Sequence, residues 1–206
     1  MKKSILTAAV VFALSAASSA YAGNTITFLG EITDSTCDVS VEGGNSTITL
    51  PSVSKSLLSA TNSTAGRVSF ALLAENCALG NGKSKVAAYF NGNGAEGADA
   101  NNIDSTTGYL NNLATDPNPT NAAYDADDAT TYYQDAATNV QLRLIDGTSN
   151  AVIKAGFADQ VDDAGYVTVD TSNNARLPYS VEYISVAGSA TPGPVKGMVV
   201  YDLMYQ

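Results

Sequence analysis

The chain contains no histidine and no tryptophan among its 206 residues. The absence of histidine excludes Ser-His-Asp and Cys-His triads, zinc sites with histidine ligands, and histidine as a general base. A secreted hydrolase that uses an Asp or Glu pair as acid and base stays open as an alternative, but no motif supports it. The sequence therefore predicts no catalytic residue and no cofactor.

Basic residues are also few. Lys and Arg together number 10 against 20 Asp and Glu, which gives a net charge of −10. Such a surface suits neither nucleic acid nor anionic lipid, so neither is a predicted partner. The acidic clusters at Asp125–Asp128 and Asp162–Asp163 lack the spacing of a calcium loop, and we interpret them as solvated surface. No metal site is predicted.

The chain has no apolar run long enough to span a membrane. The longest, 5–17, is too short for an anchor. It follows Lys2-Lys3 and precedes Ala20-Tyr21-Ala22, and this order is typical of a bacterial signal peptide with its cleavage site. Residues 1–22 are therefore predicted to be removed on export, without membrane insertion.

Only two cysteines occur, Cys37 and Cys77. They lack the Cys-x-x-Cys spacing of a redox pair. In an exported chain, an even pair indicates a disulfide. On the chain-entropy model this bond stabilises the fold by about 4 kcal/mol.

The most frequent structural signal in the sequence is a short strand followed by a turn. Their alternation and β-branched content predict an all-β sandwich with no helix of normal length. The predicted strands cover 36–41, 47–50, 68–73, 85–90, 139–145, 151–154, 166–169, 179–184 and 198–205. Residues 91–138 are rich in Asn, Gly, Ala and Asp, and are predicted to form a long surface excursion with a short ordered piece at 109–113.

A further strand is predicted directly behind the signal peptide. Ile26, Phe28, Gly30 and Ile32 occupy every second position, so they share one face of an extended strand. No turn pair follows to fold this strand back as a hairpin. An apolar strand of this kind needs a sheet edge, and another molecule can supply it. This pattern indicates assembly rather than catalysis.

The final strand offers such an edge. Val199, Tyr201, Leu203 and Tyr205 alternate along one face, and the chain ends at Gln206. We predict that the far side of this strand lacks a neighbour. The four side chains would form one wall of a groove, which is also ordinary core packing.

In order along the chain, these features resemble the structural subunits of chaperone–usher fimbriae, and the type 1 major pilins in particular. The resemblance rests on the signal peptide, the segment Phe28-Leu29-Gly30-Glu31-Ile32, both cysteines, Leu144-Ile145-Asp146-Gly147, Leu177-Pro178-Tyr179, Gly193 and the penultimate Tyr205. It covers nearly all of the mature chain. The excursion 91–138 is longer and more acidic than the family pattern.

The resemblance implies an incomplete immunoglobulin-like sandwich that lacks its last strand, formed by residues 34–206. Residues 23–33 would be a free N-terminal donor strand. The implied partners are identical or related subunits, a periplasmic chaperone that grips Tyr205 and the carboxylate of Gln206, and an outer-membrane usher. The product would be an extracellular fimbrium that serves cell adhesion. The alternative is a minor or tip-proximal subunit or adhesin that binds a carbohydrate or host receptor.

Overall fold

The fold comes from a computed structural model that describes residues 30–97, 100–115, 136–161 and 165–206. These residues belong to two units, 1–32 and 33–206, of which the second contains the strands. In the first unit, Gly30 and Ile32 are exposed. Ile26, Phe28 and the signal peptide lie outside the described residues.

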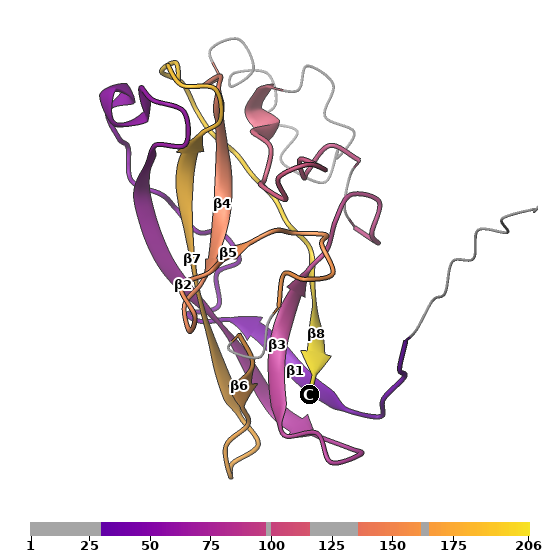
Figure 1. The fold of residues 1–206 in the computed structure, drawn as a ribbon. Coiled ribbons are helices and arrows are strands. Elements are labelled where there is room, and N and C mark those ends of the chain that lie inside the picture. The colour runs from indigo at the N-terminus through magenta and orange to yellow at the C-terminus, as the bar shows by residue number, and fades with distance from the viewer. Residues whose placement is uncertain (1–29, 98–99, 116–135, 162–164) are drawn as a thin grey trace, which may run out of the picture. The chain divides into compact units, whose positions relative to one another are not determined.

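The second unit contains two antiparallel sheets (Figure 1). The larger sheet has the strand order β1-β2-β7-β4-β5. Its members are β1 (Thr36–Val41), β2 (Thr64–Ala78), β7 (Ala175–Ser185), β4 (Val140–Asp146) and β5 (Val152–Ile153). The smaller sheet has the order β6-β3-β8, with β6 (Val167–Thr168), β3 (Lys85–Phe90) and β8 (Tyr201–Tyr205). The predicted all-β class is confirmed.

Helix is limited to two short 3₁₀ turns in the described residues, η1 (Lys55–Leu58) and η2 (Leu113–Thr115). Ser54 caps η1, because its hydroxyl accepts a hydrogen bond from the Ser56 amide. No helix in this part of the chain combines the length and hydropathy that crossing a bilayer requires.

The core lies between the two sheets and is formed by alternate residues of their strands. Phe90, Leu72 and Leu177 are each 1 % exposed. Tyr179 joins them and contacts two phenylalanines, with ring centroids 5.8 Å from Phe70 and 5.1 Å from Phe90. Close aromatic packing of this kind favours a single arrangement of the two sheets.

Ion pairs cross the opposite face of the larger sheet. Glu182 on β7 lies between Arg67 on β2, at 2.8 Å, and Arg143 on β4, at 2.6 Å. Burial by itself raises the pKa of the Glu182 carboxyl, but the hydrogen bonds from both arginines bring that pKa below its ordinary value. The three side chains therefore link three adjacent strands.

Two sequence predictions need correction. Residues 47–50 form no strand, because they follow the Gly43-Gly44 turn as an extended segment with no ladder partner among the described residues. The excursion 91–138 is not wholly on the surface, since Ile103, Leu110 and Ala114 are buried. Leu110 is bound to Leu142 on β4 by two backbone hydrogen bonds of 2.7 and 3.0 Å, which draw this segment into the sandwich.

Candidate functional site

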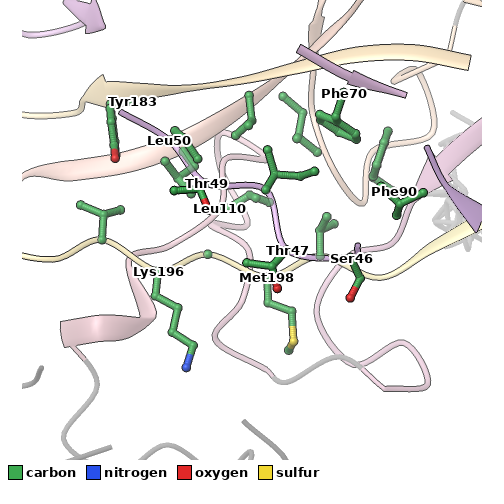
Figure 2. Close-up of a pocket in the computed structure, with 18 of the residues that line it drawn as sticks. Ser46, Thr47, Thr49, Leu50, Phe70, Phe90, Leu110, Tyr183, Lys196 and Met198 are labelled. Carbon is green, nitrogen blue, oxygen red and sulfur yellow. The ribbon is translucent and has the colours of Figure 1, made fainter. Parts of the chain in front are cut away.

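An apolar groove of about 720 Å³ opens along one side of the sandwich (Figure 2). One wall is the extended segment 46–50, which follows β1. The other is 194–201, which leads into β8. The floor comes from both sheets and from the excursion. It consists of Phe70, Leu72, Phe90, Leu110, Leu142, Leu144 and Val181.

The two walls differ in sequence, but in both of them alternate side chains pack against the core. On the first wall, Ile48 and Leu50 pack against the core, while the residues between them, Thr47 and Thr49, are exposed. On the second wall, Val199 and Tyr201 pack against the same core. Each wall therefore presents apolar side chains at a period of two, as an extended backbone requires.

Gly197 brings the second wall close to the floor. A Cβ atom at this position would lie 2.8 Å from the Leu142 side chain and 3.3 Å from the Leu110 Cβ. A side chain there would displace both leucines. The glycine therefore permits the close approach of the wall to the floor.

The backbones of the two walls are not bonded to each other. Within the described residues, β1 has only β2 as a sheet neighbour and β8 has only β3. Residues 200 and 206 flank β8 and are hydrogen-bonded to residues 91 and 85 on the β3 side, so the alternating residues Tyr201, Leu203 and Tyr205 direct their amides and carbonyls to the other side. This edge of β8 has no strand neighbour among the described residues, and it meets the groove at Tyr201.

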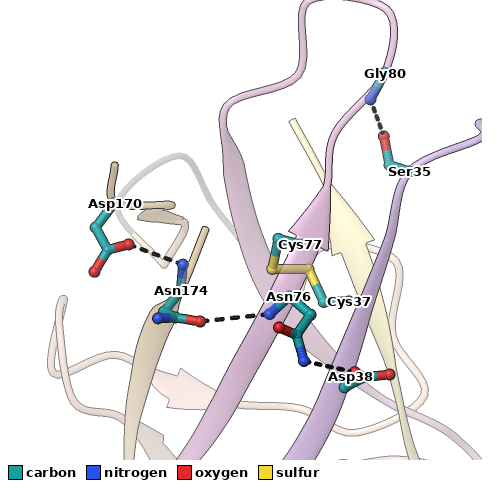
Figure 3. Close-up of a disulfide and its surroundings, with 8 residues drawn as sticks. All are labelled: Ser35, Cys37, Asp38, Asn76, Cys77, Gly80, Asp170 and Asn174. Carbon is teal, nitrogen blue, oxygen red and sulfur yellow. Dashed lines mark hydrogen bonds between the residues drawn. A yellow bond between two sulfur atoms is a disulfide. The ribbon is translucent and has the colours of Figure 1, made fainter. Parts of the chain in front are cut away.

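A disulfide ties the first strand of the sandwich to its neighbour. Cys37 on β1 is bonded to Cys77 on β2, as predicted (Figure 3). Burial raises the pKa of the Tyr205 phenol, and a hydrogen bond from the Cys37 backbone opposes that rise. Tyr205 therefore reaches from β8 to β1. Ser35 adds a further tie, since its hydroxyl accepts a 3.0 Å hydrogen bond from the Gly80 amide.

The groove carries little charge. Of the described residues that line it, Lys196 alone is charged, and Figure 2 shows its side chain extending away from the apolar floor. Burial raises the pKa of the Tyr201 and Tyr183 phenols above the ordinary tyrosine value. Apart from Lys196 and a few hydroxyl groups, the lining consists mainly of apolar side chains. It favours apolar side chains brought in on an extended backbone.

Metal ligands are not gathered in the described part of the chain, where no three His, Cys, Asp or Glu residues come together. The cluster 125–128 and residues 162–163 lie outside the described residues.

The predicted site residues at the end of the chain do not all line the groove. Val199 and Tyr201 line the groove. Leu203 and Tyr205 pack on the core below it, while the Gln206 backbone bonds to Ser84 and Lys85 beside β3. Sequence reasoning missed the first wall as a groove element. The alternation of Ile48 and Leu50 is the signal for it, but so short a run equally predicts a paired strand.

Comparison with known proteins gives a consistent result. A family model described as fimbrial protein matches residues 26–206. The major fimbrial subunit SMF-1 of Stenotrophomonas maltophilia strain K279a is 36% identical over 188 residues, covering 89% of this chain and 93% of that protein. The F17 fimbrial protein of Escherichia coli is 33% identical over 196 residues, covering 94% and 93%.

The fold agrees with this result. A subunit from the structure of a chaperone–usher pilus superposes with a TM-score of 0.54 at 18% identity, covering 90% of this chain and 97% of that one. The family consists of structural, non-enzymatic proteins of surface fimbriae. From the family match and the two relatives, we conclude that this chain belongs to the fimbrial protein family.

Proposed function

We propose that this fimbrial subunit polymerises by donor-strand exchange, in which residues 23–33 of one copy fill the groove of the next. The observation that carries the proposal is the apolar groove between 46–50 and 194–201, with an edge of β8 that meets it at Tyr201. A strand placed there would satisfy backbone groups and complete the smaller sheet. The resulting polymer would be the shaft of a surface fimbrium that serves adhesion.

The donor segment has the pattern that such a groove requires. Ile26, Phe28 and Ile32 would each contribute roughly 1.5–3 kcal/mol if fully buried. Gly30 shares their face and would allow a close approach of the two backbones at one point. The opposite face carries Thr25, Thr27, Leu29 and Glu31, and the three polar residues suit an exterior position on the assembled sheet.

Before assembly, the same groove needs protection. A periplasmic chaperone is proposed to occupy it after export, and an outer-membrane usher to exchange the chaperone for the next subunit. The predicted signal peptide supports the first step of this route, which is export. An apolar groove left exposed would otherwise promote aggregation.

The test replaces one face of the donor segment at a time. The triple variant Ile26→Ser, Phe28→Ser, Ile32→Ser is expected to yield folded monomers and no SDS-resistant ladder on gels. The matched control changes the opposite face, Thr25→Ser, Thr27→Ser and Leu29→Ser, and should polymerise. Deletion of residues 24–33 is expected to match the first variant. Ladders from that deletion would refute the proposal.

A further inference from the structure

The smaller sheet has a second edge. It lies along the part of β3 that the short strand β6 does not cover. Residues 85 and 91 exchange backbone hydrogen bonds with the β8 side. By alternation, Val86, Ala88 and Phe90 direct their amides and carbonyls to the opposite side. That side would accept an added strand as readily as β8 if its groups were unpaired.

Strand β6 covers only the beginning of this edge. It pairs with β3 at two positions, Lys85 with Thr168 and Val86 with Val167. The Val169 amide also donates to the Ser84 carbonyl at 3.0 Å. Beyond Val86, no described strand lies against this side of β3.

Beyond the end of β6, side chains supply the hydrogen-bond partners of the β3 backbone. The Ala88 amide donates to the Tyr179 hydroxyl at 3.0 Å, although Tyr179 belongs to the other sheet. The Phe90 amide donates to Oε1 of Gln160 at 2.8 Å. In return, Nε2 of Gln160 donates to the Phe90 carbonyl at 2.9 Å. The Gln160 amide thus makes the paired bonds that a neighbouring strand would make.

The segment that carries Gln160 is itself fixed to β3. The Gly156 amide donates to the Phe90 carbonyl at 2.8 Å. Gly156 and Gly92 approach so closely that a Cβ at Gly156 would lie 2.7 Å from the Gly92 Cα. Gln160 also donates to the Phe157 carbonyl at 3.1 Å, which orients its amide toward Phe90.

We propose that Gln160 and Tyr179 are specificity residues that close the β3 edge to strand addition and leave β8 as the acceptor. The inference rests on the proposed function, because it concerns where an incoming donor strand can pair. Its physical basis is that a strand gains little by adding to an edge whose amides already have partners. Backbone groups with no partner would favour the same addition.

The test maps where a donor strand binds. A synthetic peptide of residues 24–33 with a benzophenone group is mixed with the mature chain, and photocrosslinks are located by mass spectrometry. The variants are Gln160→Ala and the double variant Gln160→Ala, Tyr179→Phe. The control is Gln141→Ala, which removes a buried amide bonded to Asp104 and Asn111 but leaves β3 untouched.

In the wild type and the control, crosslinks are expected on 46–50 and 194–205 only. In Gln160→Ala, and more strongly in the double variant, they should also fall on 85–90 and 155–161, with at least a severalfold gain. An unchanged crosslink pattern in folded Gln160→Ala protein overturns the inference. Absence of groove crosslinks in the wild type contradicts the proposed function instead, while new β3 crosslinks in the variants would still support the closed edge.

Discussion

The smaller sheet has one edge along β3, beyond the short strand β6, and another along β8. The strands β3 and β8 are of similar length, but different groups lie against their two edges. On β3, a short strand and the side chains of Tyr179 and Gln160 pair with the backbone. On β8, the outward side has no strand neighbour among the described residues, and Tyr201 lines the groove of about 720 Å³. Strand propensity alone therefore does not decide which edge can accept a partner. That depends on whether side chains from other parts of the chain, such as Tyr179 and Gln160, are hydrogen-bonded to the backbone of that edge.

The apolar lining reinforces the difference. Beside β8, the groove offers Phe70, Leu72 and Leu142 to the alternate side chains of an incoming strand. Beside β3, the segment 155–161 is already bonded to Phe90. An added strand would thus gain hydrogen bonds and burial beside β8, whereas the amides of Ala88 and Phe90 on β3 already have partners.

The largest expected effect concerns the disulfide that joins β1 to β2. Cys37→Ser should lower the free energy of unfolding by about 2–4 kcal/mol, because the unfolded chain is no longer constrained. Chemical denaturation of the purified subunit measures this, and immunoblots of periplasmic extracts should show a lower yield. The double variant Cys37→Ser, Cys77→Ser should behave like the single one. Unchanged stability would mean that β1 needs no such tie.

A second prediction compares neighbouring residues of β8. Tyr201 lines the groove, with its ring centroid 6.2 Å from that of Phe90, whereas Asp202 is exposed and accepts a hydrogen bond from Asn91. Tyr201→Ala should cost about 2 kcal/mol of apolar burial and reduce polymer yield. Asp202→Ala should change stability by less than about 0.5 kcal/mol. Equal losses would show that the groove side of β8 has no special part in assembly.

The third prediction tests the donor that the open edge is proposed to accept. Gly30→Val should slow subunit joining about tenfold, equivalent to about 1.4 kcal/mol, because a branched side chain prevents close approach of two backbones. Light scattering during polymerisation measures the rate. Thr27→Val, on the opposite face of the same segment, is the control. If both variants polymerise at the wild-type rate, Gly30 does not occupy a tight position.

The smallest expected effect concerns the closed edge and depends on pH. Burial raises the pKa of Tyr179 to about 12, so the folded chain keeps this proton at pH values where an unfolded tyrosine, with a pKa of about 10, has lost it. The Tyr179 contribution to stability is therefore complete below about pH 10 and falls between about pH 10 and 12. Tyr179→Phe should cost about 1 kcal/mol at pH 7, since it leaves the Ala88 amide without its acceptor.

Denaturation curves of both proteins at pH 7 and pH 11 measure this difference. The advantage of the wild type over Tyr179→Phe should shrink at pH 11. A constant difference at both pH values would show that the Tyr179 hydroxyl is not held neutral by the fold.

Much of the fold was predictable because its signals are local. The alternation in 85–90 and 139–145 predicted β3 and β4 to within a residue at each end. The boundaries of β2 were missed, because this strand begins at the polar residue Thr64, which pairs with Ile184 on β7, and ends at Ala78, which pairs with Thr36 on β1. Tertiary pairing there outweighs local propensity.

The candidate site was predictable on one wall only. Val199 and Tyr201 were recognised from their alternation at the end of the chain, but Gly197 and Leu110 were not. Their roles depend on contacts between residues far apart in sequence, such as the paired backbone bonds of Leu110 and Leu142. A composition rich in Asn and Gly predicted a surface loop at 91–138, because a few apolar residues within it carry no periodic signal.

The sequence by itself determined the all-β class, the absence of histidine chemistry, the cysteine pair and the alternating segment 26–32, since each depends only on residue type and spacing. Only the tertiary structure decided that the groove lies between 46–50 and 194–201, and that Tyr179 and Gln160 cover the rival edge of β3. The physical reason is that the pairing of an edge depends on which distant groups the fold brings within hydrogen-bonding distance of it.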